Sequence, residues 1–259
     1  MSRLSTCFQQ VTISIDNNHE PKTYKEVVQD INWKTIMDEE LATLAHNKTW
    51  TIVDLPTNNN TVGCKWVYKL KHKVDGSMER YKARLVAKGF TQLEGLDFHD
   101  TFAPVAKIAT VRFILVIAAI RNWKLTQLDV NNAFLHGELD ETIYMDIPPG
   151  LPNTKLRQVC LLHKSLYGLR QARRQWYAQL ASFLLKNNLK SSFVDHSLFI
   201  HNMEGKITVL LVYIDDIIHT GDDINNIHNV TLLLNQEFKL KNVGDLTYFL
   251  GFEIARSNK

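Results

Sequence analysis

Two adjacent aspartates, Asp215 and Asp216, interrupt a stretch of valine, leucine and isoleucine that otherwise has the composition of a central β-strand. An unpaired carboxylate is strongly unfavourable in a protein interior, so these side chains must pair, coordinate a metal or lie at an exposed turn. The sequence from Tyr213 to Ile218 therefore predicts a tight hairpin whose turn presents both carboxylates. The plainer alternative is turn chemistry alone, because aspartate favours such positions.

A third aspartate, Asp129, ends another predicted strand, 124–130, which lies 86 residues before Asp215. If the two strands are neighbours in one sheet, the carboxylates meet at one edge. Mg²⁺ is usually held by one or two carboxylates, with waters and substrate phosphates as further ligands. A pair of such ions can activate an attacking hydroxyl and stabilise a leaving phosphate. Together with the basic segments described next, the three aspartates favour phosphoryl transfer.

Positive charge is concentrated in two segments. The chain has 30 lysines and arginines against 27 aspartates and glutamates, a net charge of +3. Residues 64–90 carry eight cations and two anions, and residues 155–174 carry six cations and no anion, which leaves −9 on the rest. Such blocks point to a polyanionic partner, nucleic acid or nucleotide phosphate, or alternatively to solvated lysine-rich faces.

The first basic block has the pattern of a β-hairpin. Cations alternate with apolar residues on both sides of Asp75-Gly76, which is a strong hairpin signal, so the hairpin has one cationic and one apolar face. Lys82 and Arg84 belong to the cationic face, which can lie over phosphates. The alternative is an exposed hairpin that lysine keeps soluble.

The remaining pattern predicts an α+β fold. Helices are expected over 30–46, over 110–123 (mostly buried, with Thr110 as its cap) and over 172–187, and further strands over 50–55 and 207–213. Their mixed order favours a sheet with helices on one face. Residues 1–29 are expected to be a loosely ordered lead-in, and residues 30–257 to form one domain.

A disulfide framework, a CxxC zinc site and membrane insertion are not expected. The three cysteines are widely separated and odd in number, which favours a reducing compartment. The longest apolar run, 113–120, is far shorter than the roughly 20 residues of a membrane span, and the N-terminus has no signal-peptide pattern. We therefore expect a soluble intracellular protein that is not secreted and has no membrane partner.

Seven longer motifs occur in order along the chain: Val62-Gly-Cys-Lys-Trp-Val-Tyr-Lys69, Tyr81-Lys-Ala-Arg-Leu-Val-Ala-Lys-Gly-Phe-Thr-Gln92, Phe102-Ala-Pro-Val-Ala-Lys107, Gln127-Leu-Asp-Val-Asn-Asn-Ala-Phe-Leu-His-Gly137, Lys164-Ser-Leu-Tyr-Gly-Leu-Arg-Gln-Ala172, Leu211-Val-Tyr-Ile-Asp-Asp-Ile217 and Tyr248-Phe-Leu-Gly-Phe-Glu-Ile-Ala-Arg-Ser257. Through them the chain, from about Trp33 to Ser257, closely resembles the reverse transcriptase domain of copia-type LTR retrotransposons, particularly those of plants.

The resemblance implies a right-hand RNA-directed DNA polymerase. The basic hairpin, about 62–92, corresponds to the fingers, and about 108–257 to a palm with an antiparallel sheet backed by helices. The sequence ends at Lys259, just past the last motif, so no thumb, RNase H, integrase or protease is expected in it. The implied partners are an RNA template, a DNA or RNA primer, dNTPs and other parts of a Pol polyprotein, in cytoplasmic particles, the nucleus or both, in an element whose DNA copy is integrated.

The resemblance also assigns roles to residues. Asp129 and Asp215 would bind two Mg²⁺ ions, with Mn²⁺ as a substitute, and the Val130 carbonyl would complete the nucleotide-metal site. Asp216 would support metal binding or orient the primer end. The other assignments are Lys82 and Arg84 on the triphosphate, Phe134 as the steric gate against ribose, Tyr167-Gly168 positioning template and nucleotide, and Leu250-Gly251 as the primer grip. Without the resemblance, Phe134 reads as a core residue, and both glycines read equally well as turn or bulge residues.

Two positions depart from the family pattern. Arg173 stands where related sequences usually have proline, which restores an N–H at a helix start and can shift the template-facing loop. His219 stands where an apolar residue is more common, and the sequence gives it no role. Two competing interpretations remain: a polymerase remnant with weak or no catalysis, and a basic RNA-binding or interaction protein that keeps only the scaffold.

Overall fold

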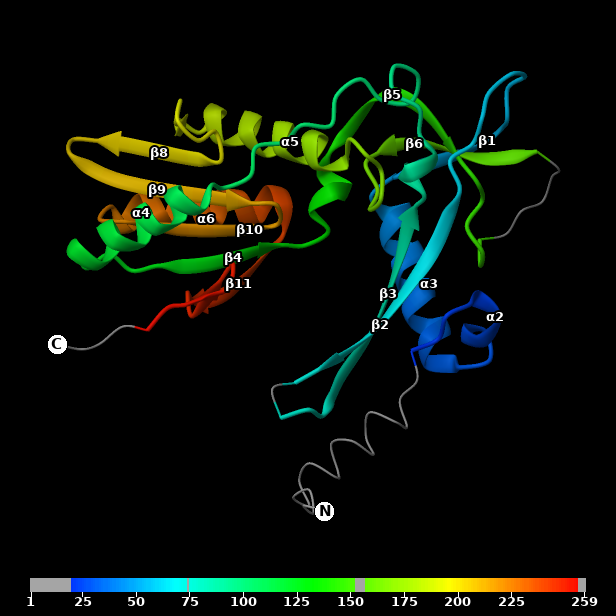
Figure 1. Cartoon of the computed structure of the whole chain (residues 1–259), viewed down its shortest axis with the longest axis horizontal. Coiled ribbons are helices and arrows are strands. Elements are labelled where there is room, and N and C mark those ends of the chain that lie inside the picture. Colours follow the sequence, from blue (N-terminus) through cyan, green and yellow to red (C-terminus); the bar gives the residue numbers. More distant parts are fainter. Residues whose placement is uncertain (1–19, 74, 152–156, 256–259) are drawn as a thin grey trace, which may run out of the picture. The chain divides into compact units, whose positions relative to one another are not determined.

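The computed structural model describes residues 20–73, 75–151 and 157–255. The chain divides into two compact units (Figure 1). The first unit comprises the residues up to His99 together with Leu139–Arg170, and the second comprises Asp100–Glu138 together with the residues from Gln171 onward. Each unit has its own sheets and helices and is described separately.

The first unit is built from two small sheets and one long helix. One sheet has the strand order β1-β6-β5 and the other is the hairpin β2–β3. The elements are α2 (Tyr24–Val27), α3 (Ile31–His46), β1 (Trp50–Asp54), β2 (Cys64–His72), β3 (Met78–Ala87), the 3₁₀ turn η1 (Gly89–Thr91), β5 (Glu138–Met145) and β6 (Gln158–Lys164). The expected loose lead-in, residues 1–29, therefore contains the short helix α2. Its residues 1–19 lie outside the described residues.

The predicted two-faced hairpin is present in the first unit. Strands β2 and β3 pair so that Lys69 is opposite Lys82 and Lys71 is opposite Arg80, which gathers the cations on one face. The other face packs on α3, where the Trp33 ring lies 5.5 Å from Tyr68 and 4.8 Å from Tyr81, centroid to centroid, both edge-on. Burial of this aromatic face fixes which side of the hairpin carries the cations. Among them Lys69, Lys71 and Arg80 are exposed, whereas Lys82 and Arg84 are half-buried.

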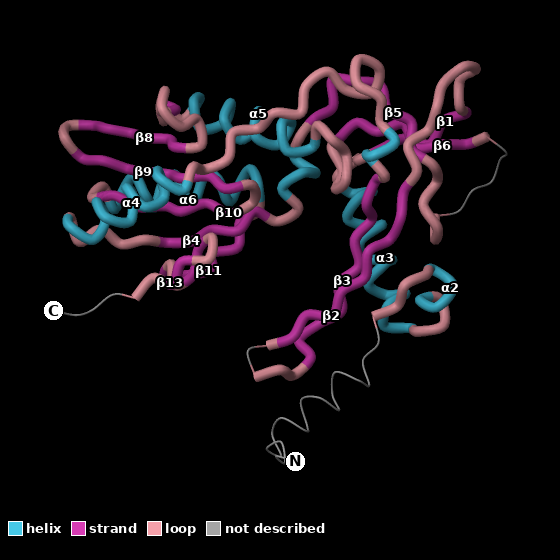
Figure 2. Tube along the Cα trace, in the orientation of Figure 1, coloured by secondary structure: helices cyan, strands magenta, loops and turns pink. Residues whose placement is uncertain are grey.

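The second unit is built around a six-stranded antiparallel sheet with the order β11-β4-β10-β9-β8-β7 (Figure 2). Its elements are α4 (Ile108–Ile120), β4 (Thr126–Val130), the 3₁₀ turn η2 (Ala133–His136), α5 (Ala172–Lys186), β7 (Lys190–Ser191), β8 (Leu198–Met203), β9 (Lys206–Tyr213), β10 (Asp216–Gly221), α6 (Ile224–Phe238), β11 (Leu240–Asp245), β12 (Tyr248–Phe249) and β13 (Phe252–Glu253).

Helices cover both faces of this sheet, which corrects the expectation of helices on one face. Leu210 and Val212 of β9 pack with α5 and α6, whereas their neighbours Val209 and Leu211 pack with α4 (Figure 1). A strand that is apolar on both faces needs cover on both sides. The continuous apolar run in β9 indicates cover on both faces, because a strand with one face in solvent would alternate apolar and polar residues.

Helix α4 begins earlier than predicted and is only partly buried. It starts at Ile108, and Thr110 lies inside it, so Thr110 is not the cap. The Thr110 hydroxyl instead donates to the carboxylate of Asp195 (2.6 Å), which also accepts from the Lys107 N–H (3.0 Å). Asp195 therefore caps the helix from a distant loop, a partner that a local sequence pattern cannot reveal. One side of the helix is exposed, with Phe113 at 60% and Ile120 at 77%.

Candidate active site at the Asp215 turn

The predicted hairpin is formed by β9 and β10, but its turn contains only Asp215, because Asp216 is already the first residue of β10. Tyr213 pairs with Asp216, so Ile214 and Asp215 form a two-residue turn. Ile214 has a φ of +58° and Asp215 has a negative φ, the combination found in type II′ turns, whose first position normally favours glycine. A β-branched residue in this region of φ costs about 1–3 kcal/mol, and such strain tends to occur at functional sites.

Two hydrogen bonds hold the turn in this conformation. The indole Nε1–H of Trp176, from α5, donates to the Ile214 carbonyl over 2.7 Å. The backbone N–H of Val130, at the end of β4, donates to the Asp215 carbonyl over 2.9 Å. The backbone of Gly137 lies close against α5: a Cβ on Gly137 would be 2.8 Å from the backbone nitrogen of Trp176, so only glycine fits there. The turn is therefore fixed to a helix and to a second strand.

Asp129 and Asp216 are directly opposite each other on β4 and β10. Side chains of opposed residues in an antiparallel pair lie on one face, with Cβ atoms about 4.5–5.5 Å apart. On the same face Asp216 is also opposite Tyr213 of β9, and Asp129 is opposite Lys241 of β11. Strand β4 thus neighbours β10, the strand after the turn, and the residue opposite Asp129 is Asp216 rather than the predicted Asp215. Lys241 was missed, because register between strands is not visible in one sequence.

Ionisation of the Asp216 carboxyl group is disfavoured by its surroundings. Its partial burial raises the pKa of Asp216; a hydrogen bond from the Gln127 amide (2.9 Å) opposes this, and the charges of Asp215 and Asp129 raise the pKa further. Mutual repulsion of this kind is relieved by a cation. The hard oxygen donors of the three aspartates therefore suit Mg²⁺ in chemical type.

A complete metal cage is not preassembled. Within residues 20–73, 75–151 and 157–255, no group of three or more His, Cys, Asp or Glu side chains gathers closely enough to hold an ion. This does not conflict with Mg²⁺, which often takes one or two carboxylates and fills its other positions with water and substrate oxygens. The fit therefore rests on donor type and on the pairing of Asp129 with Asp216.

In the first unit, Arg84 and Tyr167 are in contact. The Arg84 guanidinium carbon lies 4.0 Å from the centre of the Tyr167 ring, a cation–π geometry. The Tyr167 carbonyl accepts from the Ala87 N–H (2.7 Å). Gly168 has a φ of +93°, and a Cβ there would lie 2.1 Å from the Ala87 carbonyl oxygen, so no other residue fits. The Tyr167-Gly168 loop is thus joined to the end of β3, the strand that carries Lys82 and Arg84.

The remaining predicted site residues have less distinctive surroundings. Phe134 lies in η2, is partly buried and packs against the core cluster that contains Trp176. Leu250 and Gly251, both with positive φ (+49° and +82°), form the two-residue turn between β12 and β13. These backbone values match a type I′ turn, which explains the glycine in structural terms.

Residues 47–259 match the protein family described as "Reverse transcriptase (RNA-dependent DNA polymerase)", and the chain belongs to this family. It is 43% identical over 248 residues to the "Retrovirus-related Pol polyprotein from transposon RE1" of Arabidopsis thaliana, covering 95% of this chain and 17% of the relative. It is 39% identical over 249 residues to the corresponding polyprotein from transposon TNT 1-94 of Nicotiana tabacum, covering 94% and 19%. The predicted resemblance to copia-type reverse transcriptase domains is confirmed.

The chain spans less than a fifth of the length of these polyproteins. Among solved structures, a foamy viral protease-reverse transcriptase in complex with double-stranded DNA is similar, with a TM-score of 0.42 and 13% identity, covering 92% of this chain and 36% of that one. Among the described residues, no helix has the length and apolar character needed to cross a membrane.

Proposed function

We propose that this chain is the fingers and palm of an RNA-directed DNA polymerase from a retrotransposon Pol polyprotein. It transfers nucleotides from dNTPs to the 3′-hydroxyl of a primer on an RNA template. The basic hairpin β2–β3, within about 62–92, corresponds to the fingers, and about 108–257 to the palm, of which Leu139–Arg170 belong to the first compact unit. The observation that carries the proposal is the pairing of Asp129 with Asp216 beside the Ile214-Asp215 turn, in a chain of the reverse transcriptase family.

The carboxylates of Asp129 and Asp215, with the backbone carbonyl of Val130, hold two Mg²⁺ ions, or Mn²⁺ in their place. When bound, such ions favour ionisation of the attacking hydroxyl and stabilise the leaving pyrophosphate. Asp216 supports metal binding or orients the primer end. Its raised pKa supports this role, because a carboxyl repelled by two neighbouring carboxylates gains most from a nearby cation.

The other proposed roles concern binding and selection. Lys82 and Arg84 neutralise the triphosphate, and the Tyr167-Gly168 loop positions the template and nucleotide. Phe134 excludes a ribose 2′-hydroxyl, the atom that distinguishes RNA from DNA building blocks. Leu250-Gly251 holds the primer. Catalysis then comes mainly from positioning and from electrostatic stabilisation.

Primer extension tests the proposed function. The chain is assayed on poly(rA)/oligo(dT) with dTTP and Mg²⁺ beside Asp215→Asn, and the binding of both proteins to the same substrate is measured. Extension by the unsubstituted chain alone is the expected result. Equal binding with no extension by either protein would reject the polymerase and leave a nucleic-acid-binding module.

A further inference from the structure

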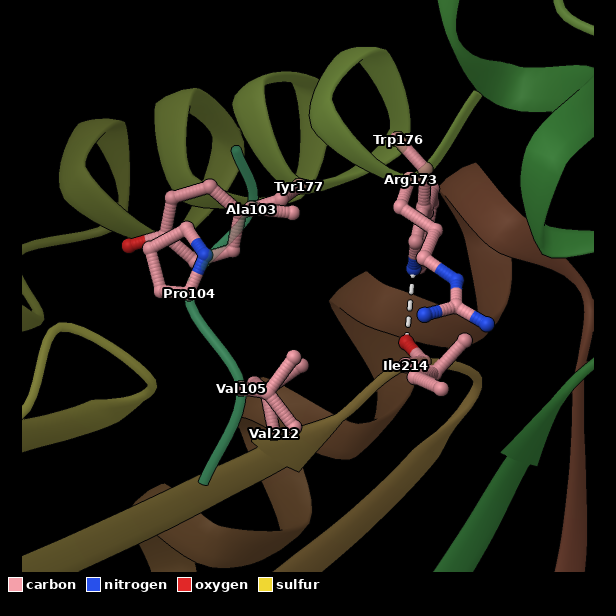
Figure 3. Close-up of a pocket in the computed structure, with 8 residues that line it drawn as sticks. All are labelled: Ala103, Pro104, Val105, Arg173, Trp176, Tyr177, Val212 and Ile214. Carbon is pink, nitrogen blue, oxygen red and sulfur yellow. Dashed lines mark hydrogen bonds between the residues drawn. The ribbon is translucent and has the colours of Figure 1, made fainter. Parts of the chain in front are cut away.

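Arg173 is placed beside the Ile214-Asp215 turn by the geometry of α5. It is the second residue of this helix and lies three and four positions before Trp176 and Tyr177, so the three side chains share one face. Because Trp176 donates to the Ile214 carbonyl, this face is held against the turn. Figure 3 shows the Arg173 guanidinium beside Ile214, at the mouth of a small pocket whose other walls include Pro104, Val105 and Val212.

The charge of Arg173 has no partner in the described part of the chain. Its side chain is exposed, and no hydrogen bond or ion pair joins it to any described residue. The next residue differs: Arg174 pairs with Asp100 over 3.3 Å. A cation in the first turn of a helix also opposes the helix dipole. Arg173 therefore does not stabilise the fold through its charge.

Arg173 approaches the turn from the side opposite to the paired carboxylates. In a strand, residues two or four positions apart point to the same face of the sheet. Asp216 therefore shares a face with Ile218, and Asp129 with Leu125, and both of these apolar residues pack with α4. The helix that carries Arg173 packs on the other face, with Val212. The guanidinium of Arg173 therefore cannot bind the same group as the carboxylates. It is available to a second anionic group farther along the same bound molecule.

We propose that Arg173 binds a backbone phosphate of the nucleic-acid strand that passes the Ile214-Asp215 turn. This rests on the proposed polymerase function. A guanidinium can hold a phosphate through two parallel hydrogen bonds. The apolar pocket wall next to it offers a surface for the adjoining sugar. Arg173 is a positioning residue: it places the strand and does not act on the reacting atoms.

The test is the salt dependence of nucleic-acid binding. Binding of a fluorescent template–primer is measured across KCl concentrations for the unsubstituted chain and for Arg173→Gln, Arg174→Gln and Lys186→Gln. Removing one phosphate contact lowers the slope of log K against log[salt] by about 1 and weakens binding about threefold to tenfold. Only Arg173→Gln should do so, because Arg174 is already paired and Lys186 lies at the far end of α5.

Neutral linkages locate the contact. Uncharged methylphosphonates replace the phosphates of the template–primer one position at a time. At a single position this replacement should weaken binding of the unsubstituted chain. The same replacement should have no effect on Arg173→Gln and should again weaken binding of Arg173→Lys. The KM for template–primer should rise in Arg173→Gln by a larger factor than kcat falls, and its Tm should stay unchanged. An unchanged salt slope would overturn the proposal, as would a shifted Mg²⁺ requirement, which would mean that Arg173 acts on the carboxylates. If no protein extends primers yet the slope falls as expected, the phosphate contact stands and the polymerase assignment fails.

Discussion

The indole of Trp176 donates a 2.7 Å hydrogen bond to the carbonyl of Ile214, the residue with positive φ in the turn that carries Asp215. This bond comes from a fully buried side chain, 1% exposed. A strained turn persists only where its surroundings enforce it. Trp176 is the residue best placed to do so.

Replacing Trp176 by phenylalanine should lower kcat by more than the loss of stability alone would explain. The change removes the bond to Ile214 and leaves a small cavity, for an expected loss of roughly 2–3 kcal/mol in unfolding free energy. Urea unfolding and primer extension measure the two effects. Trp123→Phe is the matched control, because Trp123 is also buried but belongs to the cluster around α4. Equal activity losses in both variants would contradict a role in holding the turn.

Asp216→Asn should stabilise the protein at neutral pH when divalent ions are absent. The pKa of Asp216 is raised by burial and by the neighbouring aspartates, so the folded state binds a proton more tightly than the unfolded state. Stability is therefore lost as pH rises through this raised pKa. Asparagine keeps an acceptor for Gln127 and removes the charge. We expect a gain of no more than about 1 kcal/mol, or about 2–4 °C in Tm.

The gain from Asp216→Asn should shrink as the pH falls through the raised pKa of Asp216. It should reverse when Mg²⁺ is added, because only the aspartate benefits from a bound cation. Thermal unfolding with and without Mg²⁺ measures both effects. An Mg²⁺ response that is the same in both proteins would argue against a metal near this carboxylate.

His219→Leu should make the protein less sensitive to acid. Burial lowers the pKa of His219 to about 4. Its Nδ1 lies 3.0 Å from the Thr231 hydroxyl, which itself donates to the Ile227 carbonyl, so Nδ1 is the donor. Nε2 is left buried without a partner. Leucine removes this cost and keeps the volume nearly constant.

The pH window for His219 follows from the two pKa values. Between about pH 6.5 and 4 the unfolded chain binds a proton at His219 and the folded chain does not, so stability falls as pH falls, by roughly 3 kcal/mol in total. Urea unfolding at pH 7 and pH 4.5 should show this loss only in the unsubstituted protein. The same loss in His219→Leu would assign the acid sensitivity to other groups.

Gly168→Ala should be far more destabilising than Gly251→Ala. Both glycines have positive φ, but a Cβ on Gly168 would lie 2.1 Å from the Ala87 carbonyl oxygen, whereas nothing lies within 4 Å of one on Gly251. The Gly251 variant carries only the backbone cost of about 1 kcal/mol, and the Gly168 variant should lose roughly 3 kcal/mol or more. Similar losses in urea unfolding would mean that the loop can move away from β3.

Phe134→Ala should relax selection against ribonucleotides if Phe134 is the steric gate. The kcat/KM for dTTP and for UTP is measured on one template–primer, and the ratio should fall by at least tenfold. Phe183→Ala is the control, because Phe183 is likewise a partly buried ring packed on the same core cluster. An unchanged ratio in an active Phe134→Ala protein would leave Phe134 as a core residue only.

Local patterns predicted much of the architecture. The period-two alternation around Asp75-Gly76 gave the hairpin, because strand faces follow directly from sequence. The aspartates after an apolar strand predicted the hairpin turn, but not that Asp129 lies opposite Asp216. Features that depend on distant partners were missed: the capping of α4 by Asp195, the helices on both sheet faces, and Lys241 opposite Asp129. Each depends on register or packing between segments far apart in the chain.

Strand β9 leads directly into the Asp215 turn, and its residues from Thr208 to Val212 are buried. Amide hydrogens in such a strand exchange with solvent only when the whole unit opens. We therefore expect β9 to exchange its amide hydrogens slowly, so that a ligand at the turn would meet a fixed end of the sheet rather than a loop that orders on binding.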